Sequence, residues 1–84
     1  MNSDFALNEV VLPQIPSPRQ LRALRSWFGW SQQEAAAALG VSVSTIIIYE
    51  TGVRAVTQAT LNLIAVKFAQ LGVRFSGTNL VLGE

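Results

Sequence analysis

The 84-residue chain contains no cysteine and no histidine, and these absences exclude much of the chemistry by which proteins catalyse reactions or hold metals. Without cysteine there is no disulfide framework and no thiolate metal site. Without histidine the chain lacks the commonest metal ligand and the usual general base. We therefore expect neither an enzyme nor a metal or cofactor site. The acidic residues are scattered rather than paired in the sequence: Asp4, Glu9, Glu34, Glu50 and Glu84.

Charged residues are also scarce, at 13% of the chain, whereas half of all residues are hydrophobic. The net charge of +1 permits binding to nucleic acid without arguing for it. A chain of this length buries only a modest fraction of its surface, so we expect a second copy to cover part of the apolar surface. No apolar run approaches the roughly 20 residues of a membrane helix, and no export signal is visible. A cytoplasmic location is expected.

Residues 31–52 have the pattern of two short helices joined by a tight turn. Ser31 precedes Glu34 by three residues, which is the spacing of a reciprocal capping box at a helix start. An alanine-rich run then leads to Gly40, a common terminator, and Ser42 caps a second helix that ends at a glycine. This arrangement is typical of a DNA-binding helix-turn-helix, whose second helix enters the major groove. Two helices of an unrelated small bundle fit the same spacing.

Further helices are predicted on both sides of this pair. One starts at Ser17-Pro18, where a cap precedes a proline in the first helical position, and ends at Gly29. Another follows the cap Thr57 and ends at Gly72. The helical period places these residues on the inner faces of the helices: Leu21, Leu24, Phe28, Ile46, Tyr49, Leu61, Ile64, Ala65 and Phe68.

The arginines of the first predicted helix form a stripe. Arg19, Arg22 and Arg25 recur every three residues, which puts them near one another on the helix surface. Phosphate contact is one interpretation of such a stripe, and a solvated or salt-bridged face is the other.

The two ends of the chain differ from the helical middle. Residues 1–16 show no helical period and are acidic, so we interpret them as a flexible lead in which residues 9–12 could form a short strand. Residues 17–71 form the helix-turn-helix domain. Residues 72–84 switch to a period of two, which predicts a C-terminal β-hairpin with a role in dimerisation.

The predicted hairpin has a defined register. Residues 76–79 are Ser-Gly-Thr-Asn, and glycine in the first loop position is what a two-residue type II′ turn requires. This turn pairs Phe75 with Leu80 and Val73 with Leu82 on one face. An isolated hairpin is marginally stable in water, so it should pack on helices or extend a sheet across two chains.

The fourth predicted helix is apolar beyond its inner face, because Leu63 and Val66 lie off the inward stripe. A small domain has little interior in which to bury a second apolar face, so pairing with another chain is favoured. The dimer interface that we predict combines this face with the hairpin: Leu63, Val66, Val73, Phe75, Leu80 and Leu82.

Taken together, these features resemble the phage-repressor/Cro type of helix-turn-helix domain, over about residues 18–70. The fold expected from the resemblance is mainly α: a four- to five-helix repressor-like bundle with a C-terminal β-hairpin. The resemblance rests on these segments: Leu21-x-x-Leu24-Arg25, Gly29-Trp30-Ser31-Gln32, Ala36, Leu39-Gly40-Val41-Ser42, Thr45-Ile46, Tyr49-Glu50-x-Gly52, Leu61 and Ile64-Ala65.

The resemblance also implies roles for individual residues. Arg25 and Glu50 match the family's structural ion pair, and Gln32 matches a polar residue that contacts phosphate near a helix N-terminus. Arg54, in the loop after the second central helix, stands where the family often places a basic contact to the DNA backbone. The implied DNA-binding set is Gln32, Val43, Ser44, Thr45, Ile47, Ile48, Thr51 and Arg54.

The chain departs from the family at the reading face of this helix, where Val43, Ile47 and Ile48 replace polar or charged residues. Apolar contact with thymine methyl groups is one interpretation, and docking of a protein is another. A third is that Ile48 fills space left by the small Ala35, although Trp27 or Trp30 could fill it equally.

The function implied is a transcriptional regulator, such as a repressor, that binds double-stranded DNA sequence-specifically as a homodimer and is nucleoid-associated when bound. The alternative is a protein-binding module of the same fold, antitoxin-like or anti-activator, with a toxin or an activator as its partner.

Overall fold

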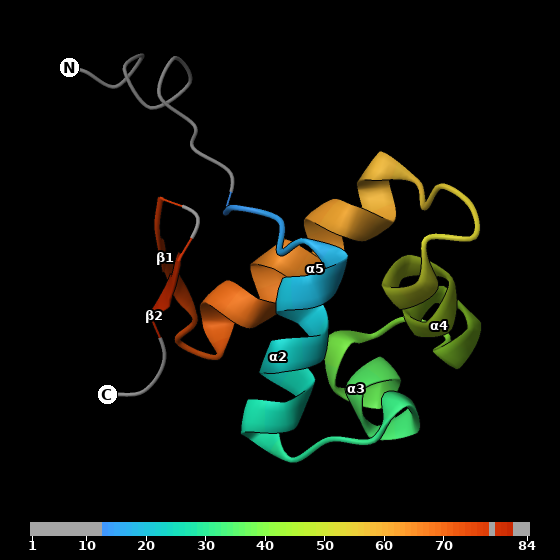
Figure 1. Cartoon of the computed structure of the whole chain (residues 1–84), viewed down its shortest axis with the longest axis horizontal. Helices are drawn as coiled ribbons and strands as arrows, with labels where there is room; N and C mark the ends of the chain where they lie inside the picture. The colour runs from blue at the N-terminus through green and yellow to red at the C-terminus, as the bar shows by residue number, and fades with distance from the viewer. Residues whose placement is uncertain (1–12, 78, 82–84) are drawn as a thin grey trace, which may run out of the picture.

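The computed structural model describes residues 13–77 and 79–81, which form a helical bundle with a small hairpin at one end (Figure 1). Among these residues, the predicted mainly α fold is confirmed. No helix in this part of the chain is long and apolar enough to cross a membrane. The elements in order are α2 (Pro18–Phe28), α3 (Gln32–Leu39), α4 (Val43–Thr51), α5 (Gln58–Gln70), β1 (Arg74–Ser76) and β2 (Asn79–Val81).

The helices begin where their capping residues predict. At the start of α3, the Ser31 hydroxyl accepts from the Glu34 amide at 3.0 Å, and the Glu34 carboxylate accepts from the Ser31 amide at 2.8 Å. Ser17 and Gln20 form the same reciprocal box at the start of α2. The turn between α3 and α4 uses Gly40 with a φ of 74°, a backbone conformation that side chains with a Cβ rarely adopt. The boundaries are therefore encoded locally.

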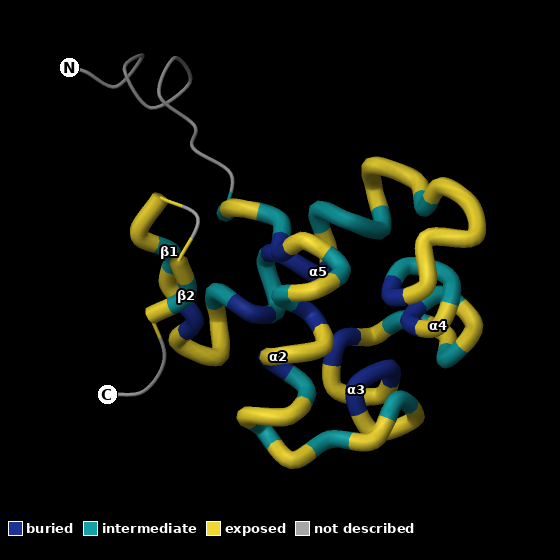
Figure 2. Tube along the Cα trace, viewed as in Figure 1, coloured by how far each residue is buried: buried dark blue, intermediate teal, exposed yellow. Residues whose placement is uncertain are grey.

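The core lies where the four helices face one another, and it continues to the base of the hairpin (Figure 2). On α3 the small residues Ala35 and Ala36 are buried in this core. The rings of Phe28 and Trp30 stack with their centroids 4.4 Å apart, beside Phe68. Of the predicted inner residues, Phe28, Tyr49 and Leu61 are half-buried and the others are buried. The buried hydrophobic residues are Leu21, Leu24, Ala35, Ala36, Leu39, Ile46, Ile64, Ala65, Phe68 and Val73.

The hairpin has the predicted register, with Phe75 opposite Leu80 and Ser76 opposite Asn79. Gly77 has the positive φ, 63°, that the first position of the turn needs. Phe75 and Leu80 pack against the core, whereas the alternate residues are exposed. The other predicted pair includes Leu82, which lies outside the described residues.

The packed body begins before Ser17. Pro16 is fully buried, and its carbonyl accepts a hydrogen bond from the hydroxyl of Tyr49 on α4. This hydrogen bond ties the segment before α2 to the helix-turn-helix, although its two residues are 33 positions apart in the sequence. The short strand predicted for residues 9–12 lies outside the described residues.

We predict that Tyr49→Phe removes part of the alkaline sensitivity of the fold. Burial raises the pKa of the Tyr49 hydroxyl. The unfolded chain therefore releases this proton first as the pH rises, so the free energy of unfolding falls above about pH 10. Urea denaturation from pH 7 to pH 11 should show a steeper decline for the native chain than for the variant, which also loses about 1 kcal/mol at pH 7 with its hydrogen bond. Parallel curves would contradict this.

Candidate nucleic-acid interface

The second helix of the helix-turn-helix, α4, is fixed by its last turn to α2 and α3. The Glu50 carboxylate accepts from Arg25 Nε at 2.7 Å and from Arg25 Nη2 at 3.0 Å, which makes a two-pronged salt bridge. The Glu50 side chain is 3% exposed and that of Arg25 is 22% exposed. Hydrogen bonding to Glu50 raises the pKa of the Arg25 guanidinium, so Arg25 stays charged. The structure therefore contains the ion pair that the family resemblance implies.

Two further side chains complete this arrangement, and sequence reasoning did not assign them to it. Gln32 Nε2, at the start of α3, donates to Glu50 Oε1 at 3.2 Å. Arg22 Nη1 donates to the Glu50 carbonyl oxygen at 2.7 Å, where a cation also complements the negative end of the helix dipole. The network of Arg22, Arg25, Gln32 and Glu50 thus joins α2, α3 and the C-terminal turn of α4.

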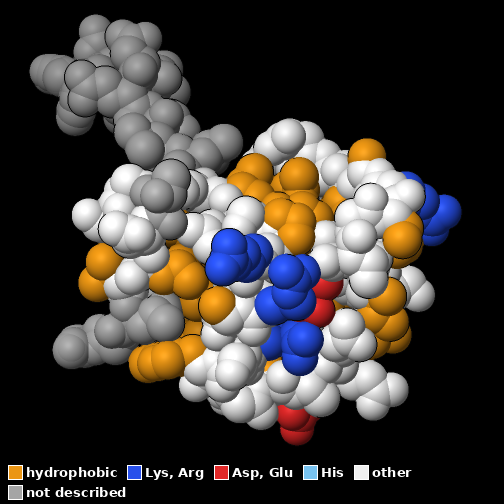
Figure 3. Space-filling view, viewed as in Figure 1, with side chains coloured by type: hydrophobic (Ala, Val, Ile, Leu, Met, Phe, Trp, Pro, Cys, Tyr) orange, Lys and Arg blue, Asp and Glu red, His pale blue; other side chains and the backbone are white. Residues whose placement is uncertain are grey.

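The network shows which arginines of the predicted stripe are engaged within the protein and which are not. Figure 3 shows basic side chains gathered beside an acidic group on one face of the molecule. Arg22 and Arg25 on this stripe are engaged by Glu50, while Arg19 is exposed. Two of the three arginines therefore hold the scaffold together.

The outer face of α4 carries apolar and hydroxyl side chains. Ser44, Ile47 and Thr51 are exposed, and Ile47 retains 41% of its accessible surface. Thr45 and Ile48 are half-buried. The helix thus offers solvent a mixed surface without a charged group.

Other residues of the predicted interface lie at its edges. Val43 is half-buried, so part of its side chain packs against the core and part is accessible to solvent. Arg54 is exposed in the loop after α4.

The two tryptophans differ in burial. Trp30 packs against the core, whereas Trp27 is 53% exposed, so Trp30 is the tryptophan that fills interior space.

The residues predicted for a dimer interface are not equally accessible. On α5, Leu63 is 38% exposed and Val66 is half-buried. Phe75 and Leu80 of the hairpin are half-buried against the core. Val73 is 5% exposed and belongs to the core of the chain itself. It is therefore too buried to contact a second copy, and we remove it from the predicted interface.

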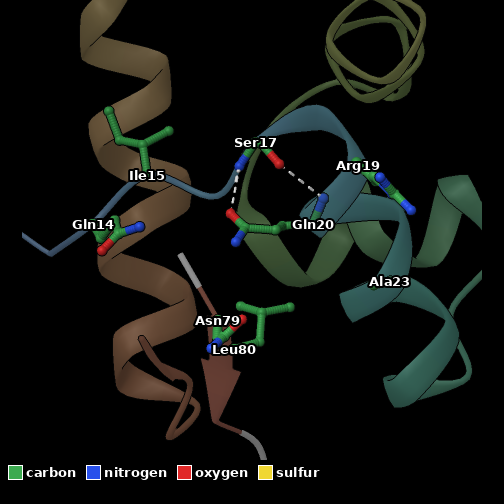
Figure 4. Close-up of a pocket in the computed structure, with 8 residues that line it drawn as sticks. All are labelled: Gln14, Ile15, Ser17, Arg19, Gln20, Ala23, Asn79 and Leu80. Atoms are coloured by element: carbon green, nitrogen blue, oxygen red, sulfur yellow. Dashed lines mark hydrogen bonds between the residues drawn. The ribbon is translucent and has the colours of Figure 1, made fainter. Parts of the chain in front are cut away.

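A groove lies between the segment before α2, the first turns of α2 and the hairpin (Figure 4). Gln14, Ile15, Gln20 and Leu80 are among its lining residues, and the Ser17 capping box stands at its wall. The described residues of this lining include no His, Cys, Asp or Glu side chain. Among the described residues, no group of three or more His, Cys, Asp or Glu side chains could hold a metal ion.

We predict that Arg25→Ala lowers the free energy of unfolding by about 3 kcal/mol, because it leaves the buried Glu50 carboxylate without its cation. Arg19→Ala is the matched control: the same residue type is removed from the same helix, but from an exposed position, and the change should stay within about 0.5 kcal/mol. Equilibrium unfolding in urea measures both. Equal effects for the two variants would show that the salt bridge adds nothing to stability.

Comparison with known families agrees with this geometry. A family model described as a helix-turn-helix matches residues 21–69, which is more than half of the chain. The match covers all of α3 and α4 and most of α2 and α5. A comparison with curated proteins gives no match. The matched region contains the network around Glu50 and the exposed face of α4, and the chain belongs to the Cro/C1-type helix-turn-helix family of DNA-binding regulators.

Proposed function

We propose that the protein is a transcriptional regulator that binds double-stranded DNA sequence-specifically as a homodimer. One observation carries this proposal: α4 is joined to α2 and α3 by the hydrogen bonds of Glu50 while its outer face is left exposed. A helix that must enter a major groove needs this combination, because base contacts demand a fixed orientation.

In the proposed complex, contacts to the DNA backbone come from both sides of α4. Arg54 is exposed just beyond the helix, where it supplies a cation to phosphate. Gln32 stands at the start of α3, where one amide hydrogen is given to Glu50 and the other is left for a phosphate oxygen. Few basic residues are free for this purpose, so binding should depend only modestly on salt.

The low charge is the reason to propose a dimer. A module with few phosphate contacts binds weakly, but two linked modules gain affinity because the second binding event occurs at a high effective concentration. With Val73 removed, the proposed interface consists of Leu63, Val66, Phe75, Leu80 and Leu82. The exposed fraction of Leu63 on α5 supports it.

The homodimer is tested by light scattering after size-exclusion chromatography. We expect a mass near twice the 9.1 kDa of one chain at micromolar concentration. Because a dimeric regulator matches the symmetry of its site, bound DNA should contain two half-sites about one helical turn apart. A mass of one chain under these conditions would contradict the proposed dimer.

The second candidate function is a protein-binding module of the same fold, which would mask a toxin or an activator. Exposed aliphatic side chains favour it, since Ile47 is 41% exposed and Val53 is 71% exposed. The two functions differ in whether purified protein binds free DNA, and the identity of the product encoded beside this gene is a further discriminator.

We predict that gel-shift titration detects binding to DNA upstream of the protein's own gene, and that Arg54→Ala weakens this binding. Loss of one phosphate contact should weaken binding to all sequences alike and reduce the slope of log affinity against log salt by about one. Arg74→Ala, which removes an exposed arginine from the hairpin, is the control and should leave the slope unchanged. Failure of the native protein to bind this DNA would count against the proposed function.

A further inference from the structure

The side chains of α4 cannot make the two-pronged base contacts that most often give a recognition helix its specificity. Guanine is read in this way by Arg or Lys and adenine by Asn or Gln. Residues 43–51 are Val-Ser-Thr-Ile-Ile-Ile-Tyr-Glu-Thr and contain none of these four types. The two larger polar residues are already engaged, because Tyr49 bonds to the Pro16 carbonyl and Glu50 is buried against Arg25.

The hydroxyl groups of α4 also offer little capacity for base-specific hydrogen bonds. Thr51 Oγ1 donates to the Ile47 carbonyl oxygen at 2.7 Å, within its own helix. Thr45 Oγ1 shares a hydrogen bond of 2.9 Å with the capping Ser42 hydroxyl. Ser44 is exposed, and its hydroxyl has no partner among the described residues. One free hydroxyl distinguishes bases poorly, because serine bonds to either a donor or an acceptor.

What remains on the reading face is an apolar surface centred on Ile47. In the major groove, the apolar feature that distinguishes one base from another is the C5 methyl group of thymine. We infer that this protein selects its DNA by thymine methyl groups packed against Ile47, with the half-buried Ile48 beside it. The inference rests on the proposed function and names what the proposed DNA site must contain.

Replacement of thymine by deoxyuridine tests this directly, because the two bases differ by the methyl group alone and pair identically. The full chain is first used to select duplexes from a random DNA library. The selected site is then made with deoxyuridine at one thymine position at a time, and the Kd of each duplex is measured. Burial of one methyl group corresponds to about a fourfold change in affinity, so each contacted thymine should show about this loss.

Two variants locate the effect. Ile47→Ala removes most of the proposed apolar contact, so it should bind thymine and deoxyuridine duplexes with nearly equal affinity. Val53→Ala truncates an aliphatic side chain that is more exposed but lies beyond the end of α4. It should keep the fourfold preference for thymine. Circular dichroism of both variants establishes that they are folded, and Ile47 is exposed, so its truncation should be tolerated.

The outcomes separate this inference from the function on which it rests. Enrichment of thymine at fixed positions, a loss with deoxyuridine and its disappearance in Ile47→Ala would support methyl-group recognition. A selected site that binds equally well with deoxyuridine throughout would overturn it, while the proposed DNA-binding function would stand. If no duplex is selected at all, the proposed function itself fails, and the apolar face of α4 is left to a protein partner.

Discussion

The buried carboxylate of Glu50 is the constraint on which the rest of the helix-turn-helix depends. A carboxylate removed from water is costly unless a cation and hydrogen-bond donors surround it. Arg25 and Gln32 supply these from α2 and α3, and Arg22 binds the carbonyl of the same residue. The four groups meet only when the three helices have one relative orientation. The network therefore fixes the orientation of α4 relative to α2 and α3.

This use of charge shapes the proposed interaction with DNA. Arg22 and Arg25 stabilise the scaffold, which leaves a chain of net charge +1 with few cations for phosphate. In the proposed complex, affinity then comes from two modules acting together, and specificity comes from a face that carries aliphatic side chains. The proposed dimer and the proposed recognition of methyl groups both follow from this composition.

Much of the fold is encoded in short stretches. Ser17 and Ser31 with their partners three residues later fix helix starts, and the position of Gly77 fixes the hairpin register of Phe75 opposite Leu80. These features were predictable because they involve backbone groups within one turn of the residue that satisfies them. The ion pair of Arg25 and Glu50 is different. It was expected from the resemblance to a family, since nothing in their local sequence brings the two residues together.

The sequence by itself thus determined the helices, their ends, most of the inner residues and the aliphatic character of α4. Tertiary structure decided which polar groups share a partner and which apolar groups share the core. Gln32 reaches Glu50 across 18 residues, and Tyr49 reaches Pro16 across 33. It also placed Val73 in the core of the chain rather than at its surface. The physical reason is that local propensities act over one helical turn, whereas desolvation of a buried group depends on every element packed around it.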